Sequence, residues 1–177
     1  MNYATIKPID VANGPGVRVS LFVSGCTHKC KGCFNKEAWD FNYGNLFDEA
    51  AEEEIFKALE PNYVEGFSLL GGEPFEPKNQ EALLPFLKRL KVKFPNKDIW
   101  CYSGYSFEND ILAGNLGNPE ITKQMISLID ILVDGEFIEE QKDLHLRFRG
   151  SANQRIIDVQ KSLKQNETVI WDGELYI

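Results

Sequence analysis

The sequence lacks the features that would place the protein in a membrane, on nucleic acid or outside the cell. No apolar run approaches the ~20 residues that a membrane-spanning helix needs. Lys and Arg number 19 against 27 Asp and Glu, for a net charge of −8, so we expect no basic face for nucleic acid and no polybasic tract for a membrane surface. Residues 1–10 do not resemble a secretory signal. We therefore expect a cytoplasmic protein without nucleic-acid or membrane partners.

Internal repeats, low-complexity segments and long linkers are also absent from the sequence. The 177 residues, 43% of them hydrophobic, suit one globular domain over residues 1–177. This length is below the ~250 residues typical of a complete eight-stranded α/β barrel. Cysteine is scarce, with four in the chain. Without a targeting segment, these cysteines are expected to stay reduced, because disulfides persist mainly in oxidising compartments.

Three of the four cysteines are concentrated in one short stretch, SGCTHKCKGCFN, residues 24–35. Cys26, Cys30 and Cys33 have the spacing C-x3-C-x2-C, which allows one loop to direct three sulfurs at a common centre. Thiolate is a soft ligand and selects zinc or an iron–sulfur cluster. Three local ligands leave one coordination position vacant. A site that performs chemistry keeps such a position for its substrate, whereas a structural site fills it from the protein.

Two other interpretations of the cysteines stay open at this point. Zinc could be bound by the three cysteines together with His28 or the distant Cys101. A disulfide with leftover thiols is disfavoured by the expected reducing setting. We interpret His28 as a solvated loop residue and Cys101 as a small core residue within a strand.

Apolar periodicity predicts strands and helices in alternation, which implies a parallel sheet covered by helices. The expected strands are 17–24, 67–70, 98–103 and 130–133, and the expected helices are 48–59, 78–94 and 120–129. Residues 156–163 fit either a strand or a helix, and residues 168–177 resemble a terminal hairpin.

Polar and glycine residues follow several of the predicted strands. In parallel sheets ligands lie at the carboxyl ends of strands, so Gly71-Gly72-Glu73-Pro74, Ser103 and Asp134 are candidate ligand contacts. Each has a simpler interpretation, as a chain-reversing turn or a cap. The aromatic residues of 35–47 are expected to cover the site, and residues 146–158 carry arginines that could bind a carboxylate or form surface ion pairs.

Several blocks of this sequence, in order, resemble the radical S-adenosylmethionine superfamily. Within it, the chain is similar to the family of activating proteins of anaerobic ribonucleoside-triphosphate reductase. The three-cysteine motif marks the superfamily, and the flanking blocks, above all RGSANQR, mark the narrower family. The blocks are residues 13–35, 68–79, 97–105, 131–137 and 149–158.

This resemblance implies a partial, open parallel α/β barrel of the radical S-adenosylmethionine type. It implies a 4Fe–4S cluster held by Cys26, Cys30 and Cys33, whose fourth iron is chelated by the amino and carboxylate groups of S-adenosylmethionine. The implied cofactor contacts are Gly32, Cys33 and Phe34 beside the adenine, Gly71, Gly72, Glu73 and Pro74 at the methionine amino group, and Ser103, Asp134 and Asn153. Many members of the superfamily have an aromatic residue at the position of Gly32.

The implied activity is radical generation. A flavodoxin- or ferredoxin-like donor would supply one low-potential electron through the cluster. Reductive cleavage of the cofactor would give methionine and a 5′-deoxyadenosyl radical, which takes hydrogen from a backbone glycine of the large reductase subunit. No catalytic side chain is then required beyond the cluster and cofactor. The alternatives are a small-molecule radical enzyme that resembles a deazapurine synthase, and a non-catalytic zinc-binding module.

Overall fold

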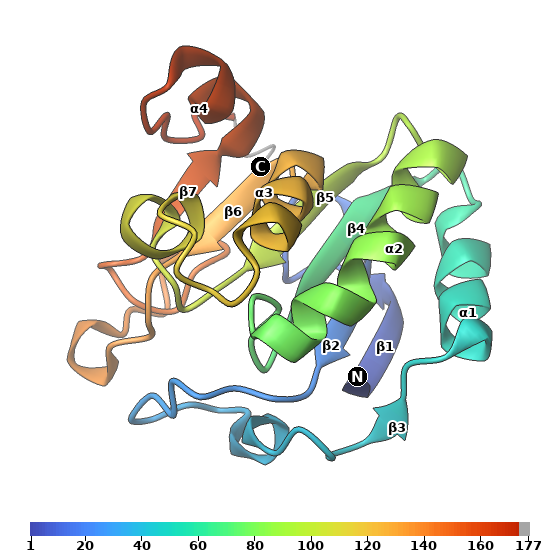
Figure 1. The fold of residues 1–177 in the computed structure, drawn as a ribbon, viewed down its shortest axis with the longest axis horizontal. Helices are drawn as coiled ribbons and strands as arrows, with labels where there is room; N and C mark the ends of the chain where they lie inside the picture. Colours follow the sequence, from blue (N-terminus) through green and yellow to red (C-terminus); the bar gives the residue numbers. More distant parts are fainter. Residues whose placement is uncertain (174–177) are drawn as a thin grey trace.

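Seven strands form one mixed sheet in the computed structural model of the chain, which describes residues 1–173 (Figure 1). The strands are β1 (Asn2–Asp10), β2 (Val17–Val23), β3 (Asn45–Leu46), β4 (Val64–Gly71), β5 (Asp98–Tyr102), β6 (Ile131–Asp134) and β7 (Arg155–Asp158). Their order in the sheet is β3-β1-β2-β4-β5-β6-β7. The two edge strands, β3 and β7, do not pair with each other, so the sheet is open.

Four α-helices and three shorter helical turns connect the strands. They are α1 (Glu49–Leu59), α2 (Pro77–Lys93), α3 (Pro119–Leu128) and α4 (Val159–Gln165), with η1 (Lys36–Trp39), η2 (Phe107–Leu112) and η3 (Glu139–Gln141). Local sequence fixes where the helices begin. The Asp48 side chain accepts a hydrogen bond from the backbone N–H of Ala51 and caps α1, while α2 and α3 start with proline. None of the helices in the described part of the chain is both long and apolar enough to cross a membrane.

The centre of the sheet is a run of four parallel strands. β2, β4, β5 and β6 are neighbours in chain order, and α1, α2 and α3 connect them. Connections between parallel strands are almost always right-handed. Because β2, β4, β5 and β6 follow one another in one direction across the sheet, their connecting helices lie on the same face. Figure 1 shows α1, α2 and α3 together in front of the sheet. The opposite face is left for loops and ligands.

Side-chain alternation along β5 separates the two faces. Ile99 and Cys101 belong to the main core beneath the helices, whereas Trp100 and Tyr102 pack on the opposite face. Cys101 is fully buried, which confirms its interpretation as a core residue. The predicted helices and the four predicted parallel strands are likewise confirmed, within a few residues at their ends.

The expected parallel sheet is confirmed at its centre but not at its edges. β1 and β7 are antiparallel to β2 and β6, and β3 is antiparallel to β1. β1 escaped prediction because Pro8 interrupts it and its exposure pattern does not alternate cleanly. Residues 156–163, which fit either a strand or a helix, contain one of each, because β7 ends at Asp158 and α4 begins at Val159. The Asp158 carboxylate accepts a hydrogen bond from the backbone N–H of Lys161 and caps α4.

The expected terminal hairpin of residues 168–177 lies partly outside the described residues. Within them, Ile170 bridges to Ile157 of β7, so this segment pairs with the main sheet.

Candidate functional site

Loops from the four parallel strands meet at the carboxyl edge of the sheet. They are residues 24–35 after β2, which we call the cysteine loop, residues 72–76 after β4, residues 103–106 after β5 and residues 135–138 after β6. A cavity of about 360 Å³ lies among them. Cys26, Cys30 and Cys33 all line this cavity.

Backbone hydrogen bonds hold the start of the cysteine loop against its neighbours. The N–H of Gly25 donates to the carbonyl of Ala38 at 2.8 Å, and that of Cys26 donates to Trp39 at 3.3 Å. In turn, the N–H of Glu73 donates to the carbonyl of Gly25 at 2.8 Å. The loop therefore leaves β2 in a fixed direction before its first cysteine.

Backbone groups lie beside each of the three sulfurs. The backbone N–H of Asn35 donates to the Cys33 sulfur at 3.4 Å, and the backbone of His28 and Lys29 beside Cys26, and of Phe137 beside Cys30, acts to lower the pKa of those thiols. Burial raises the pKa of the Cys26 thiol to about 11, and it also raises that of Cys30, while the backbone groups act in the opposite direction. Thiolates must form for a metal to bind, so these groups favour the ligating form, and metal loading must release protons.

The three thiols of the cysteine loop are a donor set of the kind that holds an iron–sulfur cluster. A zinc site needs all its ligands within ~2.0–2.3 Å of one atom, and among residues 1–173 no three His, Cys, Asp or Glu side chains converge in this way. In an iron–sulfur cluster the cysteines bind different irons, so their sulfurs can stand farther apart. Cys101, one of the two candidates for a fourth zinc ligand, is fully buried beneath the helices.

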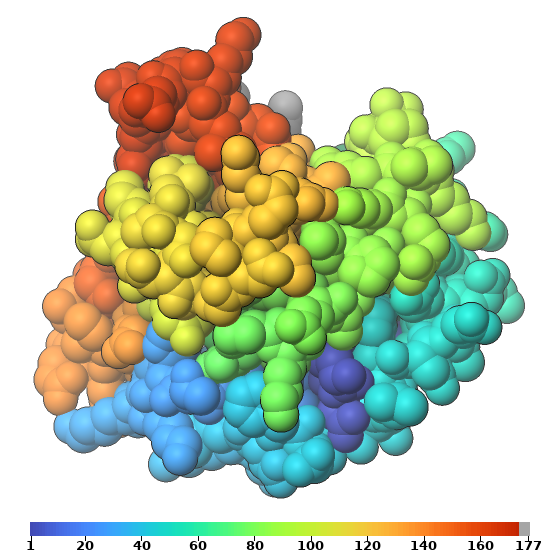
Figure 2. Space-filling view, in the orientation of Figure 1, coloured from blue at the N-terminus to red at the C-terminus, as the bar shows by residue number. Residues whose placement is uncertain are grey.

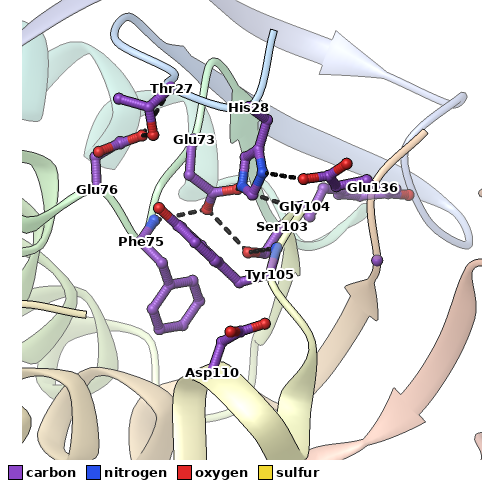
Figure 3. Close-up of polar contacts among 12 residues, drawn as sticks. Thr27, His28, Glu73, Phe75, Glu76, Ser103, Gly104, Tyr105, Asp110 and Glu136 are labelled. Atoms are coloured by element: carbon purple, nitrogen blue, oxygen red, sulfur yellow. Dashed lines mark hydrogen bonds and ion pairs between the residues drawn. The ribbon is translucent and has the colours of Figure 1, made fainter. Parts of the chain in front are cut away.

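Glu73 is the polar centre of the loops around the cavity (Figure 3). Its carboxylate is 1% exposed and accepts hydrogen bonds from the backbone N–H of Phe75 at 2.8 Å, from the Ser103 hydroxyl at 2.9 Å and from the backbone N–H of Gly104 at 2.7 Å. Nε2 of His28 lies 3.2 Å from it. A carboxylate offers about four acceptor positions, so Glu73 is fully engaged within the protein.

His28 joins the cysteine loop to two other loops. Besides Glu73, its ring contacts Glu136 through Nδ1 at 2.8 Å and packs against Tyr105 with ring centroids 4.3 Å apart (Figure 3). Burial by itself would lower the pKa of His28, but its hydrogen bonds and attraction to Glu73 and Glu136 outweigh burial and raise the pKa to about 9. The expectation of a solvated histidine is therefore wrong, because only 8% of the His28 side chain is exposed.

The two glycines after β4 are required by close backbone packing. A Cβ on Gly72 would lie 2.5 Å from the carbonyl oxygen of Gly25, and one on Gly71, whose φ is +114°, would lie 2.5 Å from the backbone nitrogen of Val23. Both glycines line the cavity. They therefore seat the cysteine loop and also present backbone to a ligand.

The remaining predicted contacts divide into two groups. Phe34, Gly71, Gly72, Glu73 and Ser103 line the cavity with the cysteines, whereas Gly32, Pro74, Asp134 and Asn153 do not.

The two polar residues of the second group have partners elsewhere. Asp134 accepts from the backbone N–H of Phe107 at 2.9 Å and from Nε of Arg155 at 3.0 Å. The Asn153 amide nitrogen donates to the carbonyl of Glu136 at 2.8 Å, whereas its Oδ1 is buried without a hydrogen-bond partner among the described residues. Both residues thus hold neighbouring segments of the chain in place.

Sequence reasoning missed cavity walls that come from distant segments. Ala12 and Asn13 line the cavity from the turn before β2, although a turn signal such as Asn13-Gly14-Pro15-Gly16 by itself predicts only a change of chain direction. The Ser68 hydroxyl donates to the carbonyl of Asn13 at 2.6 Å and holds that turn over the sheet. Tyr102 lines the opposite face of β5, and its hydroxyl is buried without a hydrogen-bond partner among the described residues. An unpaired buried hydroxyl is costly and fits a cavity that receives a ligand.

Comparison with known proteins agrees with this site. Residues 12–157 match the family described as "4Fe-4S single cluster domain", so the chain belongs to a class of proteins built around one such cluster. The chain is 47% identical over 161 residues to a Haemophilus influenzae protein, covering 88% of this chain and 97% of the relative. It is 41% identical over 156 residues to an Escherichia coli protein, covering 87% and 96%.

A relative from Enterobacteria phage T4 is 40% identical over 156 residues, covering 88% of this chain and 93% of its own. All three relatives are named anaerobic ribonucleoside-triphosphate reductase-activating protein. The chain belongs to this family of activating proteins.

Proposed function

We propose that this protein activates anaerobic ribonucleoside-triphosphate reductase by generating a glycyl radical on the large subunit of that enzyme. The proposal rests on one observation above all. Cys26, Cys30 and Cys33 from a single loop line one cavity at the carboxyl edge of the parallel strands, in a chain whose relatives are named for this activation. The radical would come from reductive cleavage of S-adenosylmethionine at a 4Fe–4S cluster.

The three cysteines would hold the cluster through three of its irons, and the fourth iron would take the nucleotide. When bound, the cluster and cofactor supply the one-electron chemistry that splits the sulfonium. The chain itself provides ligation, orientation and shielding from water. No residue of the cavity needs to act as an acid or a base.

We assign cofactor contacts to the predicted residues that line the cavity, namely Cys33, Phe34, Gly71, Gly72 and Ser103. Gly32, Pro74, Asp134 and Asn153 support the surrounding loops in this proposal. Glu73 also acts as a support, since its carboxylate already has four partners inside the protein. The methionine ammonium would then be met by backbone carbonyls near Gly71 and Gly72.

The fold supports a partial barrel of the radical S-adenosylmethionine type. Parallel strands that follow in chain order, with their helices on one face, are the arrangement from which an α/β barrel is built. Here β2, β4, β5 and β6 supply that arrangement, and the antiparallel edge strands leave it open. The electron donor in this proposal is a flavodoxin- or ferredoxin-like protein of the cytoplasm.

The names of the relatives favour a protein substrate over a small molecule, because each is called an activating protein of a reductase. The cavity volume of about 360 Å³ lies within the ~300–1,000 Å³ that ligand pockets commonly span.

The test is electron paramagnetic resonance of the large reductase subunit after anaerobic incubation with reconstituted protein, reductant and S-adenosylmethionine. We expect a glycyl radical signal that requires the nucleotide. Cys30→Ala should abolish both the iron and the signal, while the matched control Cys101→Ser should retain both. Cofactor cleavage coupled to turnover of a small molecule, without a radical in the subunit, would favour the alternative enzyme. A colourless protein with one zinc would contradict the proposal.

A further inference from the structure

Two surface segments meet at the mouth of the cavity. We call residues 29–36 the first lip and residues 142–149 the second lip. Phe34 lines the cavity from the first lip, and Leu146 and Phe148 line it from the second. An ion pair connects the first lip to the segment that precedes the second lip, because Nζ of Lys31 lies 2.9 Å from the carboxylate of Glu140. Figure 2 shows the blue and orange surfaces of the two segments next to each other at the lower left.

Large apolar side chains project from both lips. Phe34 is 93% exposed and Leu144 is 87% exposed, the two highest values among the large hydrophobic residues of the described chain. Burying a side chain of this size is favourable by roughly 1.5–3 kcal/mol, so both are poorly placed in water. Phe34 and Leu144 belong to the two segments that border the cavity, which points to a protein partner that covers them.

The charge of the lips is opposite to that of the whole protein. The lips hold Lys29, Lys31, Lys36, Lys142, Arg147 and Arg149 against one carboxylate, Asp143. The two lips therefore carry a net charge of +5 in a chain whose net charge is −8, and the net charge is +3 when Glu139 and Glu140, which contact the first lip, are included. Lys31 is paired with Glu139 and Glu140. Lys29, Lys142 and Arg147 are exposed, and within residues 1–173 none of these three forms an ion pair.

We infer that the two lips form the docking surface for an acidic protein face with an apolar centre, on the large reductase subunit around its reacting glycine. The inference rests on the proposed function, because that reaction requires the partner to reach this opening. The exposed aliphatic side chain of Leu144 on the second lip favours protein over nucleic acid, which would use aromatic stacking and phosphate contacts instead. The basic residues of the lips would steer the partner, and the exposed apolar side chains would lose their bound water on contact.

The test measures the affinity of the purified large subunit for the reconstituted protein at several salt concentrations. Leu144→Ser should weaken binding about tenfold or more, as expected from the loss of one buried leucine. Arg147→Glu should weaken binding several-fold at low salt and much less at high salt, since salt screens exposed charges. Val92→Ser, which removes a side chain that is 84% exposed on α2, and Lys123→Glu on α3 are matched controls and should bind like the parent.

A second measurement separates docking from chemistry. Reductive cleavage of S-adenosylmethionine without the large subunit should be unchanged in Leu144→Ser and Arg147→Glu, because neither side chain lines the cavity. The inference is overturned if both variants bind the subunit as the controls do, or if they lose cofactor cleavage and binding together. If the parent protein neither binds the subunit nor produces its radical, the proposed function itself fails.

Discussion

The substitution Glu73→Ala tests whether this carboxylate supports the surrounding loops or contacts the cofactor directly. The substitution removes the acceptor for the backbone N–H groups of Phe75 and Gly104 and leaves His28 without one of its two carboxylates. Removing one partner of a buried charge pair costs about 3–5 kcal/mol. A domain of this kind has only about 5–15 kcal/mol of stability, so the loss should be large.

Glu73→Gln provides a graded comparison. It keeps the volume and one acceptor oxygen but loses the charge, so we expect a loss of about 1–3 kcal/mol. Glu53→Ala, on the exposed side of α1, is the matched control and should stay within about 0.5 kcal/mol of the parent. Urea unfolding of the metal-free, reduced protein, followed by circular dichroism, gives these free energies.

Iron content after anaerobic reconstitution should fall in the same order as stability, because Glu73 holds the loop that carries the cysteines. The reasoning is refuted if Glu73→Ala unfolds with nearly the parent free energy and full iron content but fails to bind S-adenosylmethionine. That result would assign the carboxylate to the cofactor.

Three further predictions follow from single contacts. In Gly72→Ala the new Cβ would lie 2.5 Å from the Gly25 carbonyl oxygen. We therefore expect the free energy of unfolding to fall by about 1–3 kcal/mol and the iron content to fall with it. Normal iron uptake would contradict this packing. Cys101→Ser should lower the free energy of unfolding by about 1–3 kcal/mol by burying a hydroxyl, yet iron per chain should equal that of the parent. The hydrogen bonds from Arg155 lower the pKa of Glu108 from 4.5 to about 2. Its stabilising contribution is thus complete above pH 4.5 and lost as the pH falls towards 2, so the stability difference between the parent and Glu108→Gln should shrink over that interval, and a constant difference would refute the pairing.

The cysteine loop and its place at a strand end could be predicted because both depend on local sequence. Spacing within residues 24–35 allows three sulfurs to face one centre, and the apolar run of 17–24 places that loop at the end of a buried strand. The chain order of strands and helices likewise gave the parallel centre of the sheet.

The role of His28 could not be predicted, because its partners are remote in the sequence. Glu73 is 45 residues away and Glu136 is 108 residues away. The same reason explains Asp134, which ends a strand as expected but pairs with Arg155, 21 residues farther along. Strand-end position alone does not tell whether a carboxylate faces a ligand or a neighbouring element.

The cavity walls were missed for a related reason. Asn13 and Phe148 lie more than one hundred residues apart in the chain, and only the tertiary fold brings both of them to the cavity. A turn motif in the sequence predicts a change of direction, and tertiary contacts such as the Ser68 hydroxyl on the Asn13 carbonyl decide what the turn covers.

The most direct test of the central claim is the spectrum of the loaded protein, reduced without air, before and after addition of S-adenosylmethionine. If three thiolates leave one iron for the nucleotide, its binding should alter the electron paramagnetic resonance signal of the reduced cluster. A signal that does not change at saturating nucleotide would contradict the account.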